Sequence, residues 1–248
     1  MRTDLNHADP ALGLPADDGG ALDMLTMLQF ADSFFPSGAT SFSWGLESLR
    51  HDARVSNAEQ VFEVLCAHIE QRWAGFDRPL MHAAREAWVQ RGAAALSDAV
   101  ELDRLCEAMN LTRSWRDASR RLGFTQLRVH ADLGQGIAQV YLDQVRASGL
   151  PGHLPVVQGL VWGAYGLSAS GCDAMASSGL CTTVVGAALR LGLIGHTEGQ
   201  RLLTRTRPLI ARVMAAPPCP VDALWSGAPV LDLAAMRHEP RAARLFAN

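Results

Sequence analysis

The stretch LTRSWRDASRRLGFTQLRVHAD, residues 111–132, has the clearest structural pattern in this chain of 248 residues. Its mostly apolar positions recur at alternating steps of four and three residues, at Leu111, Trp115, Ala118, Leu122, Thr125 and Val129. Such steps place side chains on one face of an α-helix. Four arginines lie off this face, namely Arg113, Arg116, Arg120 and Arg121. We therefore predict a packed helix with a basic outer flank.

Helical patterns also dominate the rest of the chain. Alternation with a period of two is nearly absent, and alanine and leucine prevail in every long segment, which favours helices over strands. Two capping boxes, Ser56 with Glu59 and Thr197 with Gln200, predict helix starts. We expect further helices at about 21–31, 41–50, 56–75, 79–90, 97–109, 136–146 and 197–214. The sequence thus predicts an all-α, single-domain bundle of about ten helices.

The segment between His153 and His196 contains only two charged residues, Asp173 and Arg190. Its first uncharged run is broken by several glycines, and its second run is shorter than a bilayer usually requires. We therefore expect a buried central hairpin of helices and no membrane span. Glycines one turn apart in the first run would let another helix approach closely.

The two ends of the chain differ from this helical body. Residues 1–20 are acidic and lack an apolar stretch, so we expect a disordered leader without a secretory signal. Residues 21–216 should form the helical domain, and three prolines (217, 218 and 220) should end it. Residues 217–248 then form a C-terminal extension.

The five cysteines are dispersed and odd in number, which indicates reduced thiols and a cytoplasmic location.

Composition and spacing exclude several kinds of chemistry. All 22 basic residues are arginines, so a Schiff-base lysine and a phosphate-binding P-loop lysine are both absent. None of the eight histidines pairs with another histidine or a cysteine at metal-ligand spacing, so we expect no metal site. The formal charge of −3 does not suggest broad nucleic-acid binding. The arginine flank could bind phosphate, RNA or an acidic protein face, or it could be a solvated helix face.

A catalytic serine or cysteine also lacks support. No GxSxG motif is present, and the nearest candidate nucleophiles are Ser170 and Cys172. We predict no catalytic residue and no cofactor. The remaining features are typical of protein contact, because aromatic residues gather in the turn near residue 36, and arginine and aromatic residues gather in the tail beyond the last helix.

These two places carry a family resemblance. The family's P-x-G-A-x-S-x-S-x-G-L-E signature is matched by Pro36, Gly38, Ala39, Ser41, Ser43, Gly45, Leu46 and Glu47. Its terminal M-R-H-E and R-L-F motifs are matched by Met236, Arg237, His238 and Glu239, and by Arg244, Leu245 and Phe246. By these motifs the chain resembles the UreF family of urease accessory proteins. Thr40, Phe42 and Trp44 depart from the residues that are usual in the signature.

Two central motifs extend the resemblance over about residues 25–248. Thr112, Arg113 and Arg116 match a T-R-E-L-R segment in which Ser114 replaces the glutamate, and Leu122-Gly123 stands for a methionine-glycine turn. Arg190 to Leu203 resembles the R-L-x-x-L-G-Q-T-x-G-Q-R-L-L run, with His196 in place of the first glutamine.

The resemblance implies an all-helical, usually dimeric assembly factor, or chaperone, that is not an enzyme. Such a protein would bridge the accessory protein UreD (also called UreH) and the nickel-carrying GTPase UreG while nickel is inserted into apo-urease. The tail would order against UreD. The expected partner-binding residues are Pro36, Gly38, Ser41, Ser43, Gly45, Glu47, Arg113, Arg116, Arg237, His238, Glu239, Arg244, Leu245 and Phe246.

Two other functions stay open. The arginine flank could modulate the GTPase cycle of UreG, with Arg113, Arg116 or Arg120 acting toward the nucleotide. Alternatively, a helical hydrolase could use Ser170 or Cys172 with a histidine that the fold brings near.

Overall fold

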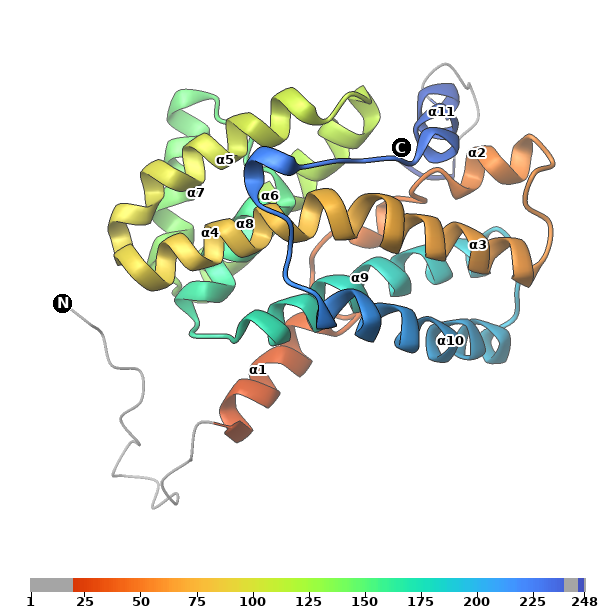
Figure 1. Cartoon of the computed structure of the whole chain (residues 1–248), viewed down its shortest axis with the longest axis horizontal. Coiled ribbons are helices and arrows are strands. Elements are labelled where there is room, and N and C mark those ends of the chain that lie inside the picture. The colour runs from red at the N-terminus through yellow and green to blue at the C-terminus, as the bar shows by residue number, and fades with distance from the viewer. Residues whose placement is uncertain (1–19, 239–244, 248) are drawn as a thin grey trace.

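The computed structural model describes residues 20–238 and 245–247, and these residues form helices and turns with no strand. Figure 1 shows the arrangement of the helices. Their bounds are α1 (Gly20–Ala31), α2 (Leu46–His51), α3 (Ala58–His68), α4 (Arg78–Arg91), α5 (Leu96–Met109), α6 (Arg113–Asp132), α7 (Gly136–Ser148), α8 (Leu154–Ala164), α9 (Ala169–Arg190), α10 (His196–Ala215) and α11 (Pro229–His238). The prediction of an all-α domain is confirmed. The predicted leader, apart from residue 20, lies outside the described residues.

Helix α6 follows the predicted pattern in its first half only. Trp115 and Leu122 are buried as expected, but Leu111 precedes the helix and is 82% exposed. In the second half the buried side chains are Gln126, Leu127 and His130. The buried face shifts because α6 packs against both α7 and α8, which together cover more than one narrow stripe.

The apolar segment after residue 153 is buried, as predicted. Helix α8 packs mainly against α4 and α6, and α9 packs against α10, so the two helices bury themselves on others more than on each other. A Cβ atom at Gly159 would overlap the carbonyl oxygen of Met81, which shows how closely α8 approaches α4. By length and composition α9 could cross a membrane, but 56% of its apolar window is buried inside the protein. This burial is typical of a core helix.

Local geometry corrects both predicted capping boxes. Helix α3 is capped by Asn57, whose side chain accepts from the Gln60 amide, while the Gln60 side chain accepts from the Ser56 amide. The box therefore lies one residue later than Ser56 with Glu59. Helix α10 begins after Gly195 without a side-chain cap, so the box at Thr197 is wrong.

The helix that begins at Ala58 does not end near Gly75, as the sequence suggested. It widens into a π-helical segment, η2 (Ile69–Asp77), and continues directly into α4. The backbone of the C-terminal extension crosses this segment. The amides of Trp225 and Gly227 donate to the carbonyl oxygens of Gly75 and Gln71 at 3.0 and 2.8 Å. Residues 216–228, called the strap below, thus connect the body to α11.

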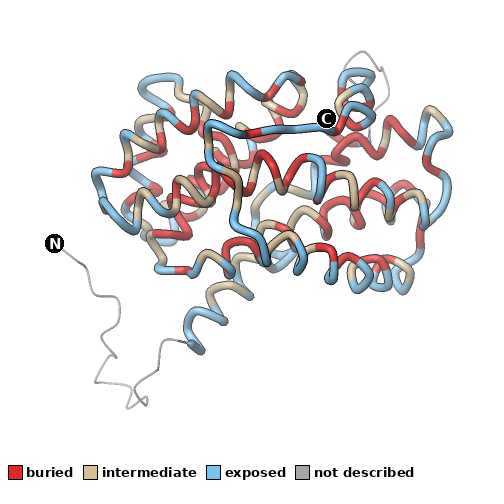
Figure 2. The backbone as a smooth tube through the Cα atoms, in the orientation of Figure 1, coloured by how far each residue is buried: buried red, intermediate tan, exposed pale blue. Residues whose placement is uncertain are grey.

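Two clusters of buried side chains form the core. The first joins α2, α3, α9, α10 and α11 with the first half of α6, and the second joins α4, α5, α7 and α8 with the second half of α6 and the start of α9. Figure 2 shows buried backbone along the central helices and almost none on α1, which projects from the body. No residue of α1 is buried. Helix α1 therefore adds no fully buried residue to the core, and it packs on the body only through partly buried residues such as Met27 and Phe30.

Candidate interaction surface

The signature segment, residues 36–47, contains a tight turn that packs against buried core residues. The Leu46 amide donates to the Ser43 carbonyl at 3.1 Å, and the two residues between them, Trp44 and Gly45, have φ values of 53° and 83°. Positive φ at both central positions defines a type I′ turn, which is costly for a non-glycine residue. This turn is why the predicted helix at 41–50 is shortened to α2.

Trp44 is held in this conformation by contacts with buried residues. Its ring centroid lies 5.0 Å from that of Trp115, and its carbonyl oxygen lies 3.0 Å from Nε2 of His68. Burial lowers the pKa of His68 to about 4, so its imidazole is neutral near pH 7. Because a carbonyl oxygen only accepts, Nε2 carries the proton and donates.

The C-terminal motif docks on this same turn. The amides of Leu245 and Phe246 donate to the two carboxylate oxygens of Glu47 at 2.7 and 3.3 Å, and the Ala247 amide donates to the Ser41 carbonyl at 2.8 Å. Two segments that are far apart in the sequence therefore form one surface. Hydrogen bonds that a carboxylate accepts are among the stronger ones in proteins.

The Leu-Phe pair of the tail is divided between the inside and the outside of the molecule. Phe246 is 4% exposed and belongs to the first core cluster, and the Arg190 guanidinium lies 4.1 Å from the centroid of its ring. Leu245 is 60% exposed. Phe246 thus fixes the tail to its own chain, and Leu245 remains available to another molecule.

Helix α11 adds an apolar row to this surface. Val230, Leu233 and Met236 are 44%, 51% and 45% exposed, and their spacing of three places them on one side of the helix. The opposite side, including Leu231, is buried against the body. The outward row and Leu245 together are called the α11 row below.

The other signature residues differ in their accessibility. Pro36, Gly38 and Ser41 are exposed, whereas Ser43 and Gly45 are buried. A Cβ atom at Gly45 would touch α11, so this residue lies under the helix of its own chain. Ser43 and Gly45 therefore lie beneath this surface and support it, rather than forming part of its exposed area.

Two of the tail motif's residues, Glu239 and Arg244, lie outside the described residues. His238 ends α11. Arg237 lies 3.3 Å from the Asp52 carboxylate, at the exposed end of α2.

The arginine flank of α6 is partly occupied by internal bonds. Arg116 donates to the carbonyl oxygens of Asn110 and Leu111 at 2.6 and 3.0 Å, and Arg120 Nε donates to Glu107 at 2.9 Å. Burial raises the pKa of Glu107, but hydrogen bonds from Arg120 and His153 outweigh that effect and lower it overall.

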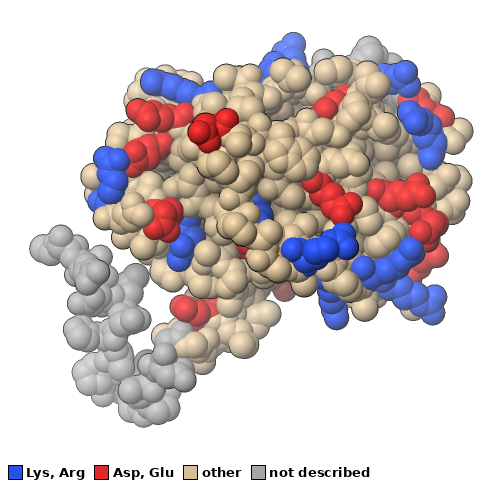
Figure 3. Space-filling model, viewed as in Figure 1, with Lys and Arg blue, Asp and Glu red and all other residues tan. Residues whose placement is uncertain are grey.

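Arg113 is more accessible than Arg116 and Arg120. Its side chain is 76% exposed and lies 3.5 Å from Asp117. On the face drawn in Figure 3, arginines and carboxylates are interspersed rather than segregated by sign. That face therefore has no extended basic field.

The candidate nucleophiles are poorly placed for catalysis. Cys172 is buried, and this burial raises the pKa of its thiol to about 12, so the thiolate is scarce near neutral pH. The Ser170 hydroxyl lies 3.2 Å from the hydroxyl of Ser168 at the exposed start of α9. Among residues 20–238 and 245–247, no group of three histidine, cysteine or carboxylate side chains could hold a metal ion.

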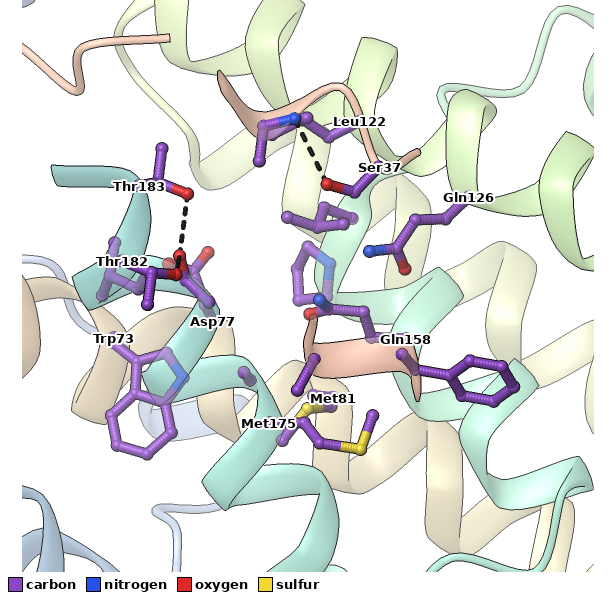
Figure 4. A pocket seen from close by; sticks show the side chains of 18 of the residues that line it. Ser37, Trp73, Asp77, Met81, Leu122, Gln126, Gln158, Met175, Thr182 and Thr183 are labelled. Carbon is purple, nitrogen blue, oxygen red and sulfur yellow. Dashed lines mark hydrogen bonds between the residues drawn. The ribbon is translucent and has the colours of Figure 1, made fainter. Parts of the chain in front are cut away.

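A cavity of about 170 Å³ lies between the helices, and no sequence pattern predicted it. Its walls come from the end of α1, η2, α6, α8 and α9. Figure 4 shows Gln126 and Gln158 facing this space, with Asp77 on the opposite side and Met81 and Met175 below. The only sequence feature that pointed to the cavity was the pair Gln126 and Gln158, two polar residues at otherwise apolar helix positions. Only the fold shows that the two side chains face the same space.

Comparison with known proteins places this arrangement in a family. Residues 55–207 match the model of the UreF family. The chain is 29% identical over 231 residues to the urease accessory protein UreF of Trichodesmium erythraeum (strain IMS101), covering 91% of this chain and 97% of that protein. It is 29% identical over 227 residues to the urease accessory protein UreF of Bacillus sp. (strain TB-90), covering 90% and 98%. For the urease accessory protein UreF 2 of Brucella canis, the values are 29%, 91% and 92%. Because the family match spans more than half of the chain, this protein belongs to the UreF family of urease accessory proteins.

Proposed function

We propose that this protein is a non-catalytic scaffold in the nickel-dependent maturation of urease. It bridges UreD (UreH) and UreG, acts in the cytoplasm on apo-urease through these partners, and works as a homodimer. The observation that carries the proposal is the docking of the tail on Glu47 and Ser41, because it joins both family motifs into one surface.

The α11 row is the part of this surface that suits UreD. Its four apolar side chains are each between 44% and 60% exposed, and they are rimmed by the charged pair Arg237 and Asp52. An apolar centre with a polar rim is the usual anatomy of a protein interface. The row stands on a helix whose other side is buried, so binding orders few additional residues and loses little entropy.

A pair of charge substitutions tests the assignment of this row to UreD. Leu233→Asp places a carboxylate in the row, and Val89→Asp does the same at a 56% exposed position on α4. In pull-downs with UreD and UreG, we expect Leu233→Asp to lose UreD and Val89→Asp to retain it. Equal retention of UreD by both variants would contradict the assignment.

Removal of residues 237–248 tests the role of the tail as a whole. This deletion also removes Phe246 from the core, so it must be accompanied by a measurement of thermal stability. A truncated protein that keeps its stability, its binding to UreD and its support of nickel activation would exclude the docking role.

Sedimentation analysis of the intact chain tests the homodimer, and a monomer at micromolar concentration would contradict it.

A second role, modulation of the GTPase, rests on the exposure of Arg113. Among the described residues, Arg113 is paired only with the half-exposed Asp117 and is 76% exposed, whereas Arg116 and Arg120 are 27% and 39% exposed, so Arg113 is better placed than these two to reach a partner. GTP turnover by UreG in the complex should fall with Arg113→Ala if the flank modulates turnover. Arg120→Ala, which breaks a contact with Glu107, reports only on the stability of the scaffold.

A further inference from the structure

His130 lies in an apolar cage on α6. It is fully buried, and neither ring nitrogen has a hydrogen-bond partner among residues 20–238 and 245–247. Three aromatic rings surround it, and the centroids of Phe30, Phe35 and Tyr165 lie 4.7, 5.3 and 5.5 Å from its own. A buried polar ring without partners is tolerated only while it is uncharged.

Two of the three cage residues come from α1 and the turn that follows it. Apart from this cage, helix α1 packs mainly on α9; none of its residues is buried, and Leu22, Met24, Leu25 and Leu28 are 52–63% exposed. Met27 packs tightly on Gly171 at the start of α9. The contact of Phe30 and Phe35 with His130 and the packing of Met27 on α9 are therefore the two attachments that fix the end of α1 to the body.

The same segment is a wall of the central cavity. Phe30, Asp32, Ser37 and Thr40 line the cavity opposite residues of α8 and α9. If Phe30 and Phe35 leave the cage, this wall moves with them. The attachment of α1 and the shape of this wall are therefore coupled through one histidine.

We propose that residues 20–40 form a gate over the central cavity, which stays closed while His130 is neutral and opens when His130 takes up a proton. The closed cage excludes water from the imidazole, whereas the open gate exposes it. Protonation therefore favours the open state, and no ligand or partner is needed to operate the gate.

The surroundings of His130 contain little charge to offset this effect. Burial alone lowers its pKa to about 4. On α6, Arg128 and Asp132 are exposed, and the Asp32 carboxylate accepts from the amide of Phe34. Directly after α8 the titratable neighbour is Tyr165, whose pKa is raised by burial, so its hydroxyl is neutral.

The direction of the pH dependence follows from these values. The open gate binds the proton with a pKa near the usual ~6.5, and the closed gate binds it only near 4. Closure is therefore fully favoured above about pH 6.5 and is lost as the pH falls toward 4. Between pH 7.5 and 5.0 the opening equilibrium should rise ~30-fold, which is the ratio of the two proton-binding terms.

Hydrogen exchange followed by mass spectrometry on the full chain tests the gate. After correction for intrinsic rates, we expect exchange of the amides of residues 20–40 to accelerate ~30-fold between pH 7.5 and 5.0. Amides of α8 (Leu154–Ala164) serve as the reference for global unfolding. His130→Leu keeps an apolar group in the cage and should abolish the acceleration, while His51→Gln, at a side chain that is 72% exposed, should retain it.

Three results would overturn the proposal. The first is pH-independent exchange of residues 20–40 in the wild type, and the second is the same acceleration in His130→Leu. The third comes from a ¹H–¹³C NMR titration of the wild-type histidines, which needs no variant. An imidazole of His130 that titrates near 6.5 without changes in the signals of Phe30 and Phe35 would show that the proton enters a closed cage.

Discussion

Replacing Phe246 by alanine should release the tail, and replacing its neighbour Leu245 should not. Phe246 is 4% exposed and Leu245 is 60% exposed, although the two residues are adjacent and both apolar. The pair therefore separates the internal anchor from the outward surface. A single substitution at each position distinguishes the two roles.

The magnitude follows from what each side chain contacts. Burying a phenylalanine side chain contributes about 1.5–3 kcal/mol, and a cation–π contact such as that of Arg190 with Phe246 adds about 0.5–1 kcal/mol at a partly exposed site. A loss of about 2–4 kcal/mol lowers the docking equilibrium of the tail by about 30- to 1,000-fold. Leu245→Ala shortens a side chain that is 60% exposed, so its effect on docking should stay within about 0.5 kcal/mol.

Hydrogen exchange at the amides of Leu245 and Phe246 measures this equilibrium directly, because both are bonded to Glu47 in the docked state. We expect rapid exchange in Phe246→Ala and wild-type protection in Leu245→Ala. Pull-downs with UreD should then show reduced binding for both variants, for different reasons. Wild-type protection in Phe246→Ala, or equal loss of protection in Leu245→Ala, would refute the division into inner and outer residues.

Three further predictions concern the body. Gly123→Ala places a Cβ against the carbonyl oxygen of Gly152, so the backbones must separate, and urea denaturation should show a loss of about 1–3 kcal/mol. Gly75→Ala overlaps the indole of Trp225, which is already 46% exposed, so tryptophan fluorescence should shift slightly to the red as that ring moves further into water; an unshifted spectrum would contradict the packing. Burial lowers the pKa of His68 to about 4, so the unfolded chain binds protons that the fold excludes. Stability should fall by up to about 3 kcal/mol as the pH drops from 6.5 toward 4, and a His68→Gln variant that showed the same slope would remove His68 as the cause.

Sequence patterns predicted the helices well where one physical effect dominated. The spacing of Trp115, Ala118 and Leu122 was sufficient for the first half of α6, and the scarcity of charge was sufficient for the burial of α8. The residues that cap the helices were predicted less accurately. Ser56 and Asn57 are both good capping residues, and the choice between them depends on backbone geometry rather than on residue type.

The candidate surface was predictable in its parts but not in its assembly. The motifs marked Glu47 and Phe246 separately, but only the fold shows that one carboxylate binds the backbone at the other. The sequence also treated Gly123 as part of a turn, whereas the structure places it inside α6, where it allows close contact with residue 152. The central cavity could not be predicted, since its walls combine residues from positions 30 to 183.

The strap also bears on the order in which the protein folds. Its amides at Trp225 and Gly227 pair with carbonyl oxygens of η2, so most of the chain lies between the two partners of each bond. Closing so large a loop is entropically costly, and contacts of this kind usually form after local helices have collapsed. The strap and α11 should therefore join the fold late, and a chain caught before that step would still expose the apolar floor on which α11 rests.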